Sequence, residues 1–179
     1  MKKLFFIAAP LLLLFIFSIN TTSCGGNKTD NDSTKTNKAD DEFNYDKSAI
    51  DKTAPVNEIS LTISGESMSD MAYSQKEIKV KSGSTIHLSL ENLCKGEAMT
   101  HNFVLVRKGT GDDIATAGIE AGASNNYVPA SKNILVSTIM LKPSGKTEIS
   151  FPAPPVGEYD YSCTFPGHWK MMLGKFIVE

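Results

Sequence analysis

The stretch Cys163–Glu179, which reads CTFPGHWKMMLGKFIVE, is the part of the chain around which the fold must be built. It places Cys163, a histidine five positions later (His168) and a methionine four positions after that (Met172) in one short loop. A proline–glycine pair shapes this loop, because proline fixes one φ angle and glycine permits an unusual one. The apolar run at its end predicts a final strand.

A fourth candidate donor lies far upstream, His101 in the segment MTHNFVLV. The four residues offer two imidazoles, one thiolate and one weak thioether, which is the donor set of a blue-copper electron-transfer site. Cu(I) favours sulfur, and both Cu(II) and Cu(I) accept imidazole. We therefore predict one copper ion held by His101, Cys163, His168 and Met172. Zinc is the rival interpretation, although zinc prefers harder tetrahedral donor sets to a thioether.

Neighbouring residues are predicted to hold these donors in place. Asn102 could hydrogen-bond across to the backbone of Cys163 and Thr164, which would join the two halves of the site. A backbone N–H near Phe165 could donate to the thiolate and raise the copper potential. Cys94 is interpreted as a small buried side chain, with a reactive thiol as the alternative.

Alternation of apolar and polar residues predicts short strands across one domain, residues 56–179. Glycine and proline separate these strands at regular intervals, which favours an antiparallel β-sandwich. Ile134–Leu141 is the most apolar of the predicted strands, and His87 falls on the polar face of another. Thr110–Asn126 is expected to form a short helix between two strands.

The first residues have the pattern of an export signal. Lys2 and Lys3 precede the apolar run Leu4–Ile19, and Ser23 stands directly before Cys24. We predict that residues 1–23 are a bacterial lipoprotein signal peptide and that Cys24 is the lipid anchor. An uncleaved anchor helix is the alternative, although the apolar run is short for a membrane span. Either interpretation puts the protein on a bacterial membrane, facing the periplasm or the cell surface.

Residues 24–55 are predicted to be a disordered linker. Their only large apolar side chains are Phe43, Tyr45 and Ile50, too few to offset the entropy lost on ordering. A flexible coil of this length reaches about 30 Å. The domain is therefore expected to stand off from the lipid surface.

The net charge of the chain bears on whether it binds nucleic acid. Without residues 1–23, which carry two lysines, the formal net charge changes from −2 to −4. This balance, with no basic cluster in the sequence, argues against nucleic acid as a partner.

Of three cysteines, Cys24 is assigned to lipid and Cys163 to metal, so no disulfide is expected.

Two motifs resemble those of the azurins and azurin-like auracyanins of the cupredoxin family. They are MTHNFVL at Met99–Leu105 and CTFPGHWKMMLG at Cys163–Gly174, and KPSGKT at Lys142–Thr147 is a weaker match. The likeness extends over residues 59–179. It implies an all-β, eight-stranded Greek-key sandwich with a short helical flap, one copper ion and electron transfer.

The resemblance also implies roles for single residues. It makes His101, Cys163 and His168 equatorial ligands and Met172 the axial ligand. Azurins have glycine where this chain has Thr100, so a plastocyanin-like site with four ligands is expected. The disulfide that azurins carry near their first strands cannot form here.

The predicted function is one-electron transfer between redox proteins, such as c-type cytochromes or a terminal oxidase or reductase. A copper-delivery or copper-storage lipoprotein is the alternative. An enzyme is disfavoured, because Ser162 stands where copper enzymes carry a histidine and Gly167 where a binuclear site needs a second cysteine. Electrons are expected to leave through the solvent-facing edge of His168, inside an apolar patch formed by Met99, Phe165 and Pro166. Trp169 either completes this patch or packs inward and steadies the loop.

Overall fold

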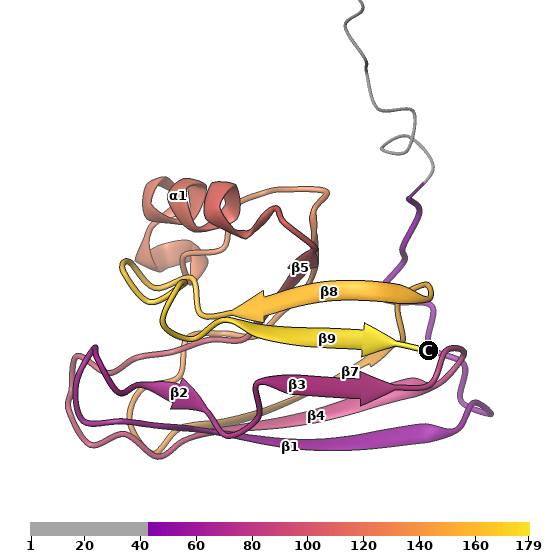
Figure 1. Cartoon of the computed structure of the whole chain (residues 1–179), viewed down its shortest axis with the longest axis horizontal. Helices are drawn as coiled ribbons and strands as arrows, with labels where there is room; N and C mark the ends of the chain where they lie inside the picture. Colours follow the sequence, from indigo (N-terminus) through magenta and orange to yellow (C-terminus); the bar gives the residue numbers. More distant parts are fainter. Residues whose placement is uncertain (1–42) are drawn as a thin grey trace, which may run out of the picture. The chain divides into compact units, whose positions relative to one another are not determined.

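Strands account for most of the regular structure in residues 43–179, the part of the chain that this computed structural model describes (Figure 1). In chain order, the elements are β1 (Val56–Ser64), β2 (Ala72–Tyr73), β3 (Glu77–Val80), β4 (Thr85–Asn92), β5 (Val104–Arg107), α1 (Gly111–Ala121), the 3-10 turn η1 (Ala123–Asn125), β6 (Ile134–Ser137), β7 (Lys146–Pro152), β8 (Gly157–Ser162) and β9 (Gly174–Val178). The predicted sandwich with a helical flap is confirmed. These residues contain nine strands instead of eight because the two-residue β2 pairs with the end of β1.

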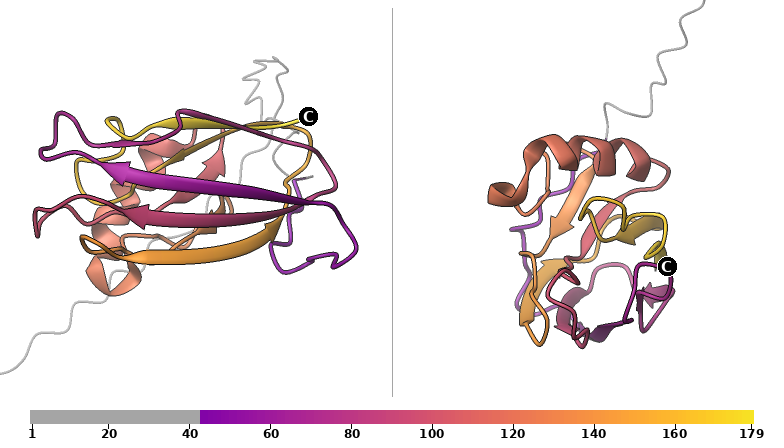
Figure 2. Two further views of the ribbon diagram at one scale, coloured as in Figure 1. Left: turned by 90° about the horizontal axis from the view of Figure 1, so that it is seen from below. Right: turned by 90° about the vertical axis from the view of Figure 1, so that its left-hand side faces the viewer.

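The strands form two sheets that face each other (Figure 2). The order is β2-β1-β4-β7 in one sheet and β3-β9-β8-β5-β6 in the other. Side chains at alternate positions point inwards, as in β4, where Ile86, Leu88 and Leu90 are fully buried. Phe151 and Phe176 meet across the interior with ring centroids 6.4 Å apart. The core is thus a layer of apolar side chains between the sheets.

Two strand pairs differ from the predicted antiparallel arrangement. β1 and β4 run parallel, with Leu61 opposite Leu90, and β3 and β9 run parallel, with Ile78 opposite Phe176. The chain leaves β1 for the opposite sheet as β3 before it returns as β4. A hairpin would force β1 and β4 to be antiparallel. Because they are joined through the other sheet instead, they can run in the same direction.

The predicted strand Ile134–Leu141 is regular only over β6. Beyond it Leu141 forms an isolated antiparallel bridge with His101. The His101 amide donates to the Leu141 carbonyl at 3.0 Å, and the Leu141 amide donates back at 2.7 Å. This bridge fixes the backbone of one candidate metal donor.

Helix α1 lies over the loop that joins β8 to β9 (Figure 1). It ends before Gly122, whose φ of 70° is favourable for glycine. Gly111 opens the helix in direct contact with the indole of Trp169: a Cβ on Gly111 would lie 1.8 Å from the ring. The absence of a side chain at residue 111 therefore allows α1 to cover this loop closely.

The domain boundaries predicted for the N-terminal part fall mostly outside the described residues. The signal peptide, Cys24 and the linker up to residue 42 are not described. Residues 43–55 lie against the sandwich: Phe43 and Tyr45 pack on the core, and the Tyr45 hydroxyl donates to the Pro152 carbonyl at 2.8 Å. The guanidinium of Arg107 lies 4.9 Å from the centre of the Phe43 ring. Within residues 43–179, no helix has the length and apolarity needed to cross a membrane.

These contacts predict that residues 43–55 stabilise the domain. A chain starting at residue 56 should unfold at lower denaturant concentration than one starting at residue 43, by about 1–3 kcal/mol, because it lacks the apolar contacts of Phe43 and Tyr45. Equilibrium urea unfolding of both chains measures the difference. A Phe43→Ala variant of the longer chain should lie between them, and equal stability of all three would show that the contacts contribute nothing.

Candidate metal centre

The segments that carry the four candidate donors flank β5, β8 and β9, and the loop joining β8 to β9 lies beneath α1 (Figure 1). Cys163 directly follows β8, while His168 and Met172 lie in the loop that leads to β9. His101 precedes β5, which pairs antiparallel with β8 and sets Val104 opposite Ser162. Neighbouring strands of one sheet thus bring His101 close to Cys163, which is distant in the sequence.

Donor atoms of His101, Cys163 and His168 all lie within 4.8 Å of one another, and all three residues are buried. Nδ1 of His101 is 3.2 Å from Nδ1 of His168, which is 3.6 Å from Sγ of Cys163. The three atoms therefore surround one small volume. One thiolate and two imidazoles are a donor set that suits copper in both oxidation states, so the residues present fit this metal.

The two adjacent methionines point in different directions. Met172 is buried in the same apolar cluster as Cys163, whereas Met171 is 47% exposed. The amide of Met172 donates to the His168 carbonyl at 3.1 Å, which closes a helical turn between the two residues. Met172 is therefore the thioether available on the inner side of the loop.

Asn102 connects the two segments that carry His101 and Cys163. Its side-chain oxygen accepts from the Thr164 amide at 2.9 Å, and its Nδ2 donates to Thr164 Oγ1 at 2.9 Å and to the Asn126 carbonyl at 3.0 Å. The amide of Phe165 donates to Cys163 Sγ at 3.4 Å. These bonds fix the backbone that follows the cysteine and tie it to the His101 segment.

Tyr73 is a supporting residue that the sequence analysis missed. It belongs to β2 in the opposite sheet, and its buried hydroxyl donates to the Asn102 carbonyl. The ring lies 5.4 Å from that of Tyr161 and 6.4 Å from that of Phe103. Nothing in the local sequence pattern indicates a contact between residues so far apart, because only the sandwich brings them together.

Burial keeps all three donors neutral in the metal-free protein. It raises the pKa of the Cys163 thiol to about 12, against the opposing effect of backbone N–H donors at Asn102 and Phe165. Burial and the neighbouring His168 lower the pKa of His101 to about 4, and burial also lowers the pKa of His168. A bound metal ion must therefore replace the thiol proton, whereas the imidazoles are already deprotonated at neutral pH.

The solvent-facing edge expected of His168 is wrong, and so is the exposed position expected of Met99, while Trp169 takes the inward alternative. His168 is only 2% exposed and lies under the Phe165 ring, with centroids 4.6 Å apart; Met99 and Trp169 are each 6% exposed. Trp169 turns inwards because Gly111 leaves room for its indole beneath α1. Phe165 and Pro166 are half-buried.

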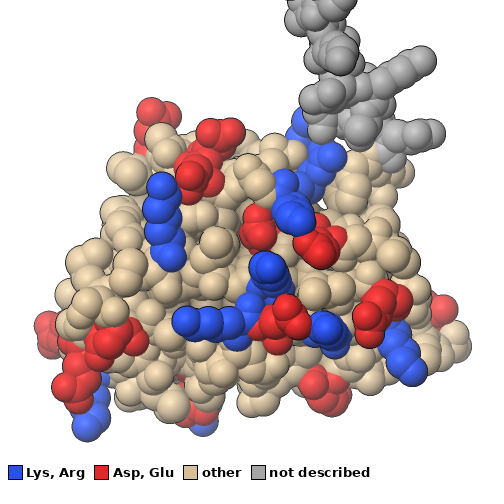
Figure 3. Space-filling model, in the orientation of Figure 1, with Lys and Arg blue, Asp and Glu red and all other residues tan. Residues whose placement is uncertain are grey.

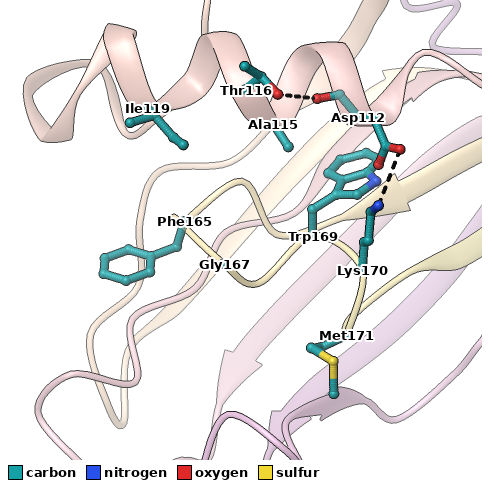
Figure 4. Close-up of a pocket in the computed structure, with 9 residues that line it drawn as sticks. All are labelled: Asp112, Ala115, Thr116, Ile119, Phe165, Gly167, Trp169, Lys170 and Met171. Atoms are coloured by element: carbon teal, nitrogen blue, oxygen red, sulfur yellow. Dashed lines mark hydrogen bonds and ion pairs between the residues drawn. The ribbon is translucent and has the colours of Figure 1, made fainter.

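A groove of about 450 Å³ lies instead between α1 and the loop (Figure 4). The residues that line it include Ala115 and Ile119 from the helix and Phe165, Gly167 and Met171 from the loop. Asp112 and Lys170 form an ion pair at 3.6 Å across one end of the groove. The surface nearest the donors is therefore concave and largely apolar.

The remaining candidates lie as follows. Cys94 is buried, as expected, and its Sγ is 3.7 Å from Nε2 of His101, a contact the sequence did not indicate. His87 is on the outer face of β4, where Nδ1 is 2.7 Å from a Glu58 oxygen and Nε2 is 3.7 Å from a Glu148 oxygen. This histidine is a cross-strand ion-pair partner and is not part of the donor cluster.

Comparison with known proteins agrees with a copper-binding role for this donor set. Residues 57–179 match the family model "Copper binding proteins, plastocyanin/azurin family". The chain is 35% identical to Auracyanin-A of Chloroflexus aurantiacus over 118 residues, covering 64% of this chain and 72% of that protein. It is 31% identical to Azurin iso-2 of a Methylomonas species over 116 residues, covering 61% and 90%.

Solved structures resemble the chain to the same extent. The dithionite-reduced auracyanin of Roseiflexus castenholzii superposes with a TM-score of 0.62 at 33% identity, covering 68% of this chain and 96% of that one. Auracyanin A of Chloroflexus aurantiacus gives the same TM-score and identity, covering 69% and 99%. The described sandwich thus has the architecture of these blue copper proteins.

The lowered pKa of His101 predicts acid sensitivity of the metal-free protein. The unfolded chain takes up this proton near pH 6.5 and the folded chain only near pH 4. The unfolded state therefore binds more protons in that window, and stability should fall by about 2 kcal/mol as the pH drops through it. Urea unfolding at about pH 7 and about pH 4.5 measures the loss. A His101→Gln variant should lose less; equal losses would assign the effect to other groups.

Proposed function

The chain belongs to the plastocyanin/azurin family of copper-binding proteins, and we propose that His101, Cys163, His168 and Met172 are the ligands of its copper. It is a blue copper protein that binds one copper ion and carries single electrons. Copper supplies the reversible change between Cu(II) and Cu(I). The observation that supports this ligand set is the convergence of one buried thiol and two buried imidazoles within 4.8 Å.

The surroundings of these residues suit a site that changes little between oxidation states. Asn102 holds the segments on either side of the site at a fixed separation through bonds to Thr164. The buried thiol and imidazoles are kept from water, so little solvent must reorganise when the charge changes. We propose that the role is electron transfer without substrate turnover.

Replacement of the ligands tests this assignment. Cys163→Ser should abolish the intense blue absorption of the copper-loaded protein while leaving the sandwich folded, because the colour requires the thiolate. Met172→Leu should retain the colour and raise the reduction potential, since the axial bond is weak and mainly tunes the metal. Visible spectra and voltammetry measure both.

The neighbouring methionine provides the control. Met171→Leu should leave colour and potential unchanged, because Met171 is exposed. A blue band that survives Cys163→Ser would exclude Cys163 as ligand. A colourless wild-type complex that passes copper to an acceptor would favour the alternative role in copper delivery.

We propose that redox proteins, such as c-type cytochromes or a terminal oxidase or reductase, dock over the groove between α1 and the loop. Phe165 links this surface to the site, because its ring covers His168. Ile119 and Met171 are exposed beside it, and Met68 lies against Gly167 from the other side. Weak redox encounters use small interfaces, and an exposed apolar patch suits one.

On the face that Figure 3 shows, charge does not favour a partner of one sign. Figure 3 shows acidic and basic side chains interspersed on the face in view. Such a surface provides no field of a single sign to steer a highly charged molecule. The apolar character of the groove is therefore the feature that supports docking.

A charge placed in the groove should slow electron exchange. Ile119→Glu and Phe165→Glu should both lower the rate with the partner, and Ile119→Glu should leave spectrum and potential unchanged because it lies on α1, away from the ligands. Val156→Glu is the matched control, since Val156 is 69% exposed in the turn between β7 and β8. Stopped-flow measurement of the electron-exchange rate tests this. Equal rates for Ile119→Glu and Val156→Glu would show that the partner does not dock over the groove.

We also propose that the protein is exported and lipid-anchored through Cys24, facing the periplasm or the cell surface. The support is the sequence alone: Lys2 and Lys3, an apolar run, and Ser23 before Cys24. The family domain begins at residue 57, which leaves this segment free to act as signal and tether.

Labelling with radioactive fatty acid tests the anchor. Expressed in a bacterium, the wild-type chain should incorporate the label, and Cys24→Ala should not. Cys94→Ala serves as the control, because Cys94 is buried in the folded domain. Equal labelling of the Cys24→Ala chain would rule out lipid attachment at this residue.

A further inference from the structure

The imidazole of His101 has two different neighbours. Nδ1 faces the donor cluster, 3.2 Å from Nδ1 of His168, and Nε2 faces Cys94 Sγ at 3.7 Å. An imidazole can bind metal through Nδ1 only when its proton sits on Nε2. His101 is fully buried, so this Nε2–H must find its acceptor inside the protein.

Cys94 is held in place by the same residue that holds the His101 segment. The Cys94 amide donates to Asn92 Oδ1 at 3.1 Å, and Asn92 Nδ2 donates to the carbonyls of Met99 and Leu141 at 2.8 Å and 3.0 Å. Leu141 is the residue that bridges His101 through its backbone. The fully buried Asn92 thus fixes the thiol and the imidazole relative to each other.

We infer that Cys94 is a positioning residue of the metal centre, whose sulfur accepts the Nε2–H of His101 and selects the tautomer that presents Nδ1 to the metal. Its own S–H lies near the Ile63 carbonyl oxygen, 4.0 Å from the sulfur. This inference rests on the proposed role of His101 as a ligand. It gives a function to the one cysteine of the described domain that the ligand set leaves unused.

A sulfur acceptor has a specific chemical effect. Sulfur accepts hydrogen bonds more weakly than oxygen. The Nε2–H bond of His101 is therefore less polarised, so less negative charge builds up on the imidazole and Nδ1 is a poorer electron donor. A poorer donor favours Cu(I) over Cu(II). The Cys94 sulfur should therefore hold the reduction potential above the value that an oxygen acceptor would give.

Nuclear magnetic resonance of ¹⁵N-histidine-labelled full-length protein tests the inference in the metal-free and Cu(I)-loaded forms. In wild type, the His101 Nε2–H should exchange slowly with solvent. Cys94→Ala should speed this exchange by about tenfold, as expected for loss of one hydrogen bond. Cys94→Ser should keep slow exchange, and its potential should shift down while that of Cys94→Ala shifts up.

The control is Ile63→Val, which also removes one heavy atom from a fully buried side chain beside Cys94. If it changes exchange and potential as much as Cys94→Ala does, the effect comes from side-chain packing and the inference is overturned. Unchanged exchange in Cys94→Ala would overturn it too. Failure of the ligand proposal would look different: copper-loaded wild type would lack the blue band, while exchange in the metal-free forms would still report on the hydrogen bond.

Discussion

The hydrogen bonds between Asn102 and Thr164 are the interaction on which the site depends most. The two residues are neighbours of His101 and Cys163, and 62 positions separate them in the sequence. One amide side chain satisfies a backbone N–H and a hydroxyl on the opposite segment, so neither segment can shift alone. Tyr73 supports the same residue from the other sheet. Both layers of the sandwich thus contribute to the separation of the donors.

Burial gives the site its chemistry as well as its rigidity. The thiol and both imidazoles are removed from water, and each is thereby driven towards its neutral form. Because all three groups are neutral, no like charges repel one another where they converge. This burial lowers the stability of the folded chain only at acidic pH, since a buried imidazolium beside a second imidazole would be poorly solvated.

Local patterns in the sequence were sufficient for part of this structure. Alternating residues located the strands, and the spacing of Cys163, His168 and Met172 could be read directly because one loop carries all three. The parallel pairing of β1 with β4 could not be read, since it depends on the chain crossing to the other sheet between them.

Contacts between distant segments could not be predicted from local sequence patterns either. The burial of Trp169 depends on Gly111, which lies in another element and has no periodic signal. The approach of Cys94 to His101 depends on a loop closed by the side chain of Asn92. Phe43 and Tyr45 looked like isolated aromatics in a polar segment, and only the folded sandwich offers them a surface.

The place of β9 between β3 and β8 constrains the order of events during biosynthesis. A growing chain that has emerged only as far as β8 lacks the strand that pairs with both β3 and β8, and it also lacks His168 and Met172, which follow β8 in the sequence. Until β9 is in place, β3 has no partner in this sheet and one edge of β8 is unpaired. Pairings this distant in sequence form slowly. The complete set of four candidate donors therefore exists only after Met172 has been added to the growing chain.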